Sequence, residues 1–265
     1  MSRLASGLLL WAVALFLAAP LVVVAGVSVN EPRQLLFPPQ GFSLRWYGEL
    51  LAEADWLNAL RNSLVIALAS AALAVSIAFP LAWFLWRHRV FYARLLWAVG
   101  VAPFTLPPVV TALGFLVFWV SVGLYGSIWA TIVSHAIFFL TLPLVTISLG
   151  LESIDRQLLE AASTMGADER TAFRTVVLPL LRPYLISGYA FAFVLSLNEY
   201  IIAYMVAGFT VETLPIKIFN SLRYGYTPVM AAVAVVFVLL AIVVFGLIAR
   251  FGDLPKLLGA YGGRG

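Results

Sequence analysis

The 265-residue chain contains no cysteine, only two histidines and few charged side chains, which make up 11% of it. Without cysteine there is no disulfide, no thiolate-bound metal and no thiol nucleophile. The sequence also shows no group of His, Asp and Glu at metal-ligand spacing and no paired nucleophile and base. We therefore expect no enzyme activity, no metal and no other cofactor bound by this chain.

Lysine is equally scarce. A phosphate-binding loop requires Gly-Lys before Ser or Thr, but the only lysines, Lys217 and Lys256, follow Ile216 and Pro255. Such a loop is therefore excluded. If ATP and its magnesium ion take part in the function, we expect a separate subunit to bind them.

Apolar residues dominate what is present, at 63% of the chain with a mean hydropathy of +1.02. Soluble domains are nearer half apolar and a quarter charged. A bilayer core of about 30 Å needs roughly 20 helical residues, and six continuous apolar runs reach that length. The predicted spans are Leu8–Val29, Ser63–Trp86, Leu95–Val120, Ser127–Leu149, Leu185–Val206 and Val229–Ala249. The sequence thus predicts an all-α integral membrane protein with six transmembrane helices in one domain, residues 1–265.

The distribution of basic residues predicts the orientation. Most of the 16 lysines and arginines fall in the segments 87–94 and 150–183 and near the two ends of the chain. Cytosolic loops are enriched in these residues, so both termini and the 150–183 loop are predicted to be cytosolic. The net charge of +4 is explained by this bias, and we expect no nucleic-acid partner.

Three further local features are predicted within and between these spans. The stretch Trp46–Asn58 is expected to form a short interfacial helix, with Trp46, Tyr47 and Trp56 at the level of the lipid headgroups. Pro107 and Pro108 predict either a break inside the third span or a helix start without a role in transport. His135, in the fourth span, is expected to pack between helices rather than to bind a ligand.

The 150–183 loop is predicted to fold as helix, tight turn and helix. Asp155 is a suitable N-cap for the first helix, and Asp168 for the second. Gly166 fits the turn between them, because glycine adopts the left-handed conformation without a Cβ clash. Pro179 and Pro183 are expected to end the second helix before the fifth span. The apolar face of the first helix is expected to comprise Leu158, Leu159, Ala162 and Met165.

Inside this loop lies a motif of fixed spacing: Glu-Ala-Ala, three residues, Gly, nine residues, Val176, one residue, Leu-Pro. It resembles the EAA loop of ABC importer permeases, which has Ile where this chain has Val176. The resemblance implies the type I ABC importer permease fold with cytosolic coupling helices that dock on a separate ATPase. The residues assigned to ATPase coupling are Glu160, Ala161, Ala162, Gly166, Asp168, Leu178 and Pro179.

The fifth predicted span carries a carboxylate, which is costly at membrane depth. The candidate solute path in this span comprises Ser196, Asn198, Glu199, Tyr200 and Tyr204. In one interpretation Asn198 and Glu199 line the path and bind a polar, cationic solute. In the other, Glu199 is a structural hydrogen-bond partner between helices, and the tyrosines simply pack.

Further segments narrow the resemblance to the spermidine/putrescine class of ABC permeases, and to the second of its two paired subunits. They are Phe42–Tyr47, Ser196–Tyr200 and Leu214–Ile216. Asn198 stands where many members of that class have an acidic residue, which leaves the identity of the solute open. The function implied is import of a small polar solute, such as a cationic polyamine. The alternative is a stand-alone secondary carrier or channel that uses Glu199 as a cation or proton site.

The resemblance also implies partners and a location. We expect an ATPase subunit dimer, a second permease in a heterodimer and an external solute-binding protein. The chain itself is expected in the bacterial cytoplasmic membrane, as a multi-pass protein in contact with lipid.

Overall fold

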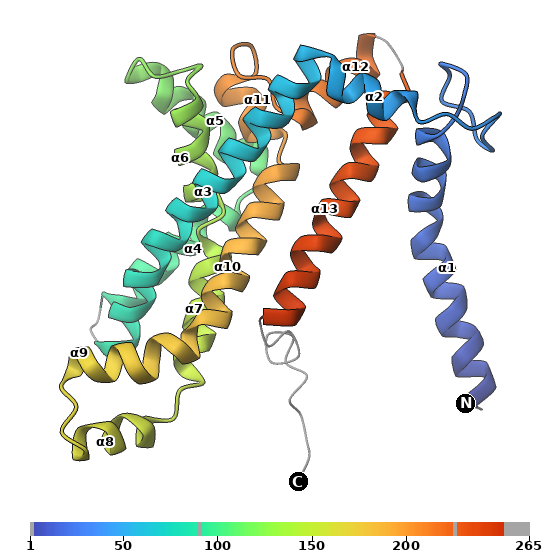
Figure 1. The fold of residues 1–265 in the computed structure, drawn as a ribbon. Coiled ribbons are helices and arrows are strands. Elements are labelled where there is room, and N and C mark those ends of the chain that lie inside the picture. The colour runs from blue at the N-terminus through green and yellow to red at the C-terminus, as the bar shows by residue number, and fades with distance from the viewer. Residues whose placement is uncertain (1–2, 89–91, 225–226, 252–265) are drawn as a thin grey trace. The chain divides into compact units, whose positions relative to one another are not determined.

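The structure, a computed structural model, describes residues 3–88, 92–224 and 227–251. Over these residues the chain is helical and has no strand, as predicted (Figure 1). The elements are α1 (Arg3–Ser28), α2 (Arg45–Ala52), α3 (Ala54–Arg87), α4 (Ala93–Thr105), α5 (Pro108–Ser121), α6 (Ile128–Phe138), α7 (Thr141–Glu152), α8 (Arg156–Thr164), α9 (Glu169–Ala172), the π-helix η1 (Phe173–Val177), α10 (Leu178–Asn198), α11 (Ile201–Ala207), α12 (Leu214–Tyr224) and α13 (Val229–Phe251). Lys256 and Arg264, which contribute to the predicted charge bias, lie outside the described residues.

The helices include three to five candidate membrane spans rather than six. Ser6–Ser28, Ala54–Arg87 and Glu169–Asn198 are each long and apolar enough to cross a bilayer. The pairs α4 with α5 and α6 with α7 qualify as two more if each bent pair is one span, with bends of 105° and 42°. The described apolar part of α13, Val229–Val244, is shorter. The six-span count therefore stays a prediction.

The break expected near Pro107 is confirmed, and two successive prolines explain it. A residue before proline is pushed towards extended backbone. Leu106 precedes Pro107 and has ψ 151°, and Pro107 precedes Pro108 and has ψ 133°. Helix α5 then starts at Pro108, where a missing N–H costs no intrahelical bond. Across the break, the Thr111 hydroxyl donates to the Pro103 carbonyl at 3.3 Å.

The fourth predicted span is also divided, although it was predicted as one continuous helix. Helix α6 ends at Phe138 and α7 starts at Thr141. Pro143, in the first turn of α7, has no N–H to donate to the carbonyl four residues earlier, that of Phe139. The 42° bend falls at this point, so the proline accounts for it.

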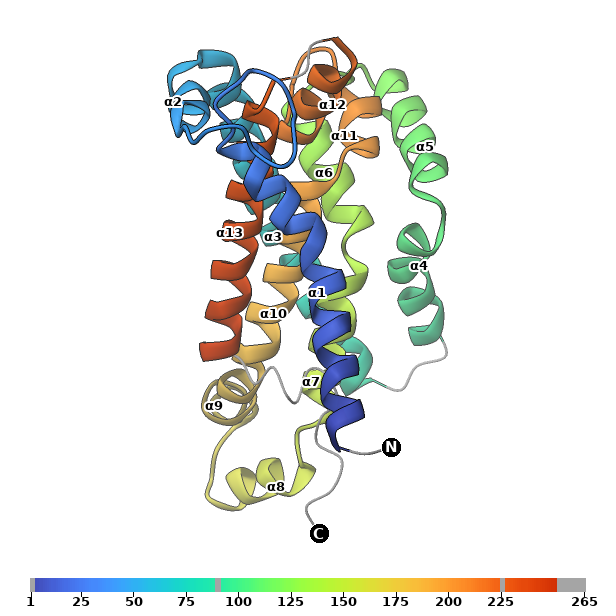
Figure 2. The same cartoon turned by 90° about the vertical axis from the view of Figure 1, so that its right-hand side faces the viewer.

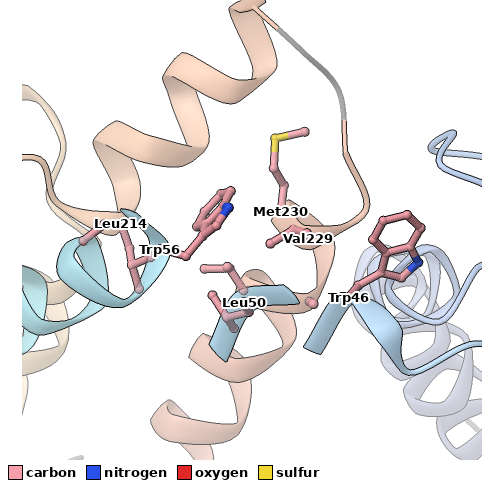
Figure 3. Close-up of a cluster of buried hydrophobic side chains, with 9 residues drawn as sticks. Trp46, Leu50, Trp56, Leu214, Val229 and Met230 are labelled. Carbon is pink, nitrogen blue, oxygen red and sulfur yellow. The ribbon is translucent and has the colours of Figure 1, made fainter. Parts of the chain in front are cut away.

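Two compact units are distinguished by their internal contacts: Met1–Arg61 with Leu214–Ile242, and Asn62–Thr213 with Val243–Gly265. In the first unit, α2 places Trp46 and Leu50 one turn apart, on the same side as the buried start of α13. Figure 3 shows this cluster of apolar side chains, drawn from α2, α3, α12 and α13. Its labelled members are Trp46, Leu50, Trp56, Leu214, Val229 and Met230.

This cluster corrects the prediction for the first loop. Trp46 and Trp56 are buried, at 0% and 4% exposed, and pack against other helices instead of presenting their rings to lipid; their position at the headgroup level stays a prediction. The Trp46 indole N–H donates to the Asn30 carbonyl at 2.6 Å, which satisfies its polar edge inside the cluster. The predicted single helix over Trp46–Asn58 is also wrong, because α2 ends at Ala52 and α3 begins at Ala54.

In the second unit α10 runs along α7, as both views show (Figures 1 and 2). Two glycines allow the close approach. A Cβ at Gly188 would lie 2.8 Å from Pro143 Cα, and one at Gly150 would lie 2.6 Å from the Tyr184 ring. Small residues at such crossings are typical of helices packed in membranes. The buried core beside them includes Leu144, Ile147, Leu151, Val177 and Leu181.

Candidate functional site

The 150–183 loop has the predicted helix–turn–helix form, and its caps are the predicted ones. The Asp155 carboxylate accepts a hydrogen bond from the Gln157 N–H at 2.9 Å and so starts α8. Gly166 lies in the left-handed region with φ +85°. The N–H groups of Gly166 and Ala167 donate back to Ser163 and Ala162, each at 3.0 Å. This pair of bonds is a Schellman motif, which satisfies the carbonyls at the end of α8.

Asp168 caps the second helix, as predicted. Its carboxylate accepts from the Thr171 N–H at 2.9 Å. Hydrogen bonding from Thr171, through its side chain and its backbone N–H, lowers the pKa of the Asp168 carboxyl. The cap therefore stays ionised, and so able to accept these bonds, at any physiological pH.

The end of the second helix differs from the prediction. Pro179 and Pro183 do not stop it, because α9 continues through the π-helical turn η1 into α10. Pro179 directly follows η1, where the Leu178 N–H donates to the Phe173 carbonyl five residues earlier, so the helix passes the proline with a shifted hydrogen-bond register. Glu169–Asn198 is consequently one continuous helix of 30 residues, which bends between α9 and α10 (Figures 1 and 2).

The two faces of α8 are also divided differently from the prediction. Ala162 is buried and Leu159 is half-buried, as expected for an inner face. Leu158 and Met165, predicted on the same face, are 47% and 82% exposed. The inner face overlies a hollow of about 800 Å³ that also touches the end of α3 and the start of η1. Aromatic rings from both sides meet there, with the Trp83 and Phe173 centroids 4.9 Å apart.

Charged groups surround this hollow. The Arg87 guanidinium at the end of α3 forms an ion pair with the Glu169 carboxylate at the start of α9. Glu160 is exposed and lines a neighbouring hollow together with Arg87 and Arg156. The loop therefore presents a charged, partly apolar surface around α8, while its inner side rests on aromatic rings.

The second candidate site is a buried chain of polar groups in the same unit. The hydroxyl oxygens of Ser70 and Ser196 are 2.9 Å apart, and the Ser196 oxygen is 2.8 Å from His135 Nδ1. His135 Nε2 lies 3.1 Å from Glu199 Oε2. This last contact does not have the geometry of a hydrogen bond, and it becomes an ion pair when the imidazole is protonated. The chain links α3, α10, α6 and the junction before α11.

Glu199 acts on the backbone of α11. Its Oε1 accepts from the Ile202 N–H at 2.8 Å, and its Oε2 accepts from the Ala203 N–H at 3.0 Å. The side chain is only 8% exposed. These contacts are those of the structural interpretation, and a role of Glu199 in solute binding stays a prediction.

The position of these residues corrects one expectation. Ser196–Tyr200 does not lie in the middle of a continuous helix, because α10 ends at Asn198 and α11 begins at Ile201. Asn198 is exposed and its amide donates to the Val194 carbonyl at 2.8 Å. Tyr200 and Tyr204 are half-buried and their rings stack, with centroids 5.4 Å apart.

Nothing in the sequence singles out Ser70, and His135 was predicted to pack between helices. Ser70 lies within a stripe of buried alanines on α3 that includes Ala67, Ala71 and Ala74. A lone serine among alanines gives no indication of its distant partner. His135 was the better signal, since an ionisable side chain in an apolar helix normally has a polar partner.

Residues 74–253 match the family model of the binding-protein-dependent transport system inner membrane component. The chain belongs to this family of ABC importer permeases. It is therefore a membrane transport component and not an enzyme. The stand-alone carrier or channel is set aside.

The relatives of this permease are similar over most of its length. It is 31% identical to the spermidine/putrescine transport system permease protein PotC of Escherichia coli, over 91% of each chain. It is 34% identical to the putrescine transport system permease protein PotI of the same organism, over 89% of this chain and 86% of that one. A putative 2-aminoethylphosphonate transport system permease protein, PhnV of Salmonella paratyphi A, is 28% identical over 92% and 91%.

Solved structures agree on the fold. A chain of a bacterial ABC transporter involved in the import of the acidic polysaccharide alginate superposes with a TM-score of 0.71 at 18% identity, covering 95% of this permease and 98% of that chain. A chain of the methionine ABC transporter MetNI gives 0.63 at 20% identity, covering 74% and 93%. The type I ABC permease fold implied by the loop motif is confirmed.

The turn at Gly166 yields a direct test. A Cβ at Gly166 would meet no atom within 4 Å, so only the positive φ opposes Gly166→Ala. We expect this variant to destabilise the loop by about 1–2 kcal/mol and to speed hydrogen exchange of the Ala167 N–H. Gly114→Ala in α5 is the control, because it has equal space and no positive φ. Unchanged exchange in Gly166→Ala would show that the turn does not depend on glycine.

The contacts of Glu199 at the junction between α10 and α11 can be tested by substitution. In Glu199→Gln the amide oxygen can still accept one of the two N–H groups of α11, but the amide nitrogen then faces the other N–H group. The negative charge opposite His135 is also lost. We expect a cost of about 1–3 kcal/mol, measured as a lower melting temperature of the purified importer in detergent. Ile201→Val, at a partly exposed side chain of the same junction, is the control and should melt as the parent does. Equal melting of Glu199→Gln and the parent would contradict the capping role.

Proposed function

We propose that this permease is one of a pair in an ATP-driven importer of polyamines or similar small cationic solutes. The similarity to PotC and PotI supports the solute class, since both names specify putrescine and the likeness covers about nine-tenths of the chain. That similarity is the observation on which the proposal chiefly rests. Its partners would be a second permease, an ATPase dimer that binds ATP and magnesium, and an external solute-binding protein.

The loop between α7 and α10 would dock on the ATPase through α8. Leu158 and Met165 support this assignment, because both are apolar and exposed next to the exposed Glu160. The matching motif residues divide into two roles. Ala162 and Gly166 shape the loop, and Glu160 offers charge to the partner.

The solute path would pass the junction between α10 and α11. Asn198 is exposed there, and the stacked Tyr200 and Tyr204 offer ring faces that attract ammonium groups. Ser196 and Glu199 would support the path from behind. In this arrangement the solute is recognised by aromatic faces and an amide more than by a free carboxylate.

The chain would cross the bacterial cytoplasmic membrane six times with both termini in the cytosol. The apolar side chains of α1 support a lipid-facing first span, since Leu8, Trp11 and Phe16 are all exposed by more than two-thirds. Helix α13 would be the sixth span, and the two bent pairs would be the third and fourth.

Uptake by the complete importer in proteoliposomes tests the function. With its binding protein and internal ATP, we expect uptake of labelled putrescine, and unlabelled putrescine should compete better than 2-aminoethylphosphonate. Glu160→Lys should lower uptake and ATPase recovery at least tenfold, because removing one partner of a buried charge pair at an interface costs roughly 2–5 kcal/mol. Glu152→Lys, the same reversal at the end of α7 outside the motif, is the control. Preferential uptake of the phosphonate would reject the polyamine assignment while leaving the coupling test intact.

The orientation is tested with single cysteines, for which the chain has no background. Cysteine at Met165, 82% exposed on the loop, should react with an impermeant maleimide only after the membrane is permeabilised. Cysteine at Phe42, 71% exposed between α1 and α2, should react in intact cells. Labelling of position 165 in intact cells would invert the topology.

A further inference from the structure

The junction between α10 and α11 depends on the Glu199 side chain, which lies between the two helices. Two N–H groups at the start of α11 are satisfied by the Glu199 carboxylate. Helix α11 is short, so these bonds are a large share of what holds its first turn. It packs on α5 and α6, so a shift of Glu199 would move the whole helix against them.

His135 is the only charged or ionisable group that α5 and α6 offer to Glu199. The described residues of these two helices contain no Asp, Glu, Lys or Arg. His135 is 1% exposed, its Nε2 lies against Glu199 Oε2, and its ring meets the Phe139 ring edge-to-face at 5.8 Å. The imidazole is therefore held in place by packing and provides the electrostatic partner of the cap.

The other side of the imidazole is anchored as well. Nδ1 contacts the Ser196 hydroxyl, which contacts the Ser70 hydroxyl. The two hydroxyls can be ordered in either direction. If Nδ1 carries a proton, it donates to Ser196, which donates to Ser70, which donates to the Ala67 carbonyl. If Nδ1 is bare, Ser70 donates to Ser196 and Ser196 donates to Nδ1. The anchor is satisfied in both protonation states of the ring.

We propose that His135 is a positioning residue of the transport path. It fixes the Glu199 carboxylate on the first turn of α11 and ties that turn to α10 and α3 through Ser196 and Ser70. In doing so it holds Asn198, Tyr200 and Tyr204 in one arrangement at the junction. The expected effect of His135 on uptake rests on the proposed solute path. Its expected effect on the position of α11 follows from the contacts alone.

A buried cysteine on α11 reports the position of the helix without any knowledge of the solute. Val206 is 0% exposed and similar to cysteine in volume, so Val206→Cys should be protected from a small membrane-permeant thiol reagent. In the complete importer, adding His135→Phe keeps the ring but removes both polar contacts. We expect the labelling rate to rise roughly tenfold or more, as for loss of a buried hydrogen-bond partner. His135→Gln keeps a donor towards Glu199 and should restore part of the protection.

Thr131→Val, one turn earlier on α6, is the matched control, because it removes a buried hydroxyl that bonds only within the helix. Its labelling should equal that of the parent. If His135→Phe does not reach the membrane, Ser196→Ala breaks the same bridge from α10 and carries the same expectation. The proposal is overturned if the His135 or Ser196 variants label no faster than Thr131→Val. It is also overturned if His135→Gln gives no protection beyond His135→Phe.

Putrescine uptake supplies a second readout. Because the junction shapes the path, KM should rise in His135→Phe by a larger factor than turnover falls, and His135→Gln should lie between this variant and the parent. If cysteine at position 206 reacts faster with the thiol reagent in His135→Phe but KM for putrescine is unchanged, His135 does not shape the solute path. If the parent importer takes up no putrescine, the polyamine assignment fails and the labelling result still decides the role of His135.

Discussion

Backbone hydrogen bonding is the constraint on which the rest of this structure depends. In hydrocarbon no water can replace a missing partner, and each unsatisfied N–H or carbonyl costs several kcal/mol. Within residues 3–88, 92–224 and 227–251, apolar helices are nevertheless interrupted at three points: between α4 and α5, between α6 and α7, and between α10 and α11. At two of the three breaks a side chain replaces a backbone partner. Thr111 donates across the first, and Glu199 accepts across the third.

The sequence predicted most of the local structure because local chemistry determines it. The caps at Asp155 and Asp168, the turn at Gly166 and the break at Pro107 each follow from the conformational limits of one or two residues. The same reasoning failed for Pro179 and Pro183, where a π-helical turn carries the helix through. Proline breaks a helix when its missing N–H and its ring fall on the regular i to i−4 hydrogen-bond register. The π-helical turn η1 shifts that register just before Pro179, and no residue pattern in the sequence predicts η1.

Contacts between residues far apart in the chain could not be predicted from the sequence. Trp46 and Trp56 have the composition of interfacial anchors, and only the packing of α12 and α13 around them makes them a core. Glu199 was recognisable as unusual, yet its partners come from Ser70 and His135, far away in the chain. The interpretation of Glu199 as a structural group needed the knowledge that two free N–H groups follow it, which depends on where α10 stops.

The uninterrupted helix from Glu169 to Asn198 bears on how force can travel. Its 30 residues are helical throughout, but the helix bends between α9 and α10, which run in different directions (Figures 1 and 2). One end is paired with Arg87 beside the exposed loop, and the other ends next to the Glu199 cap. No loop separates the two arms, so a rotation of the exposed arm is passed to the buried arm through hydrogen-bonded helical backbone. Communication between the two sites then requires no relay of side chains, only that the bend keeps its angle.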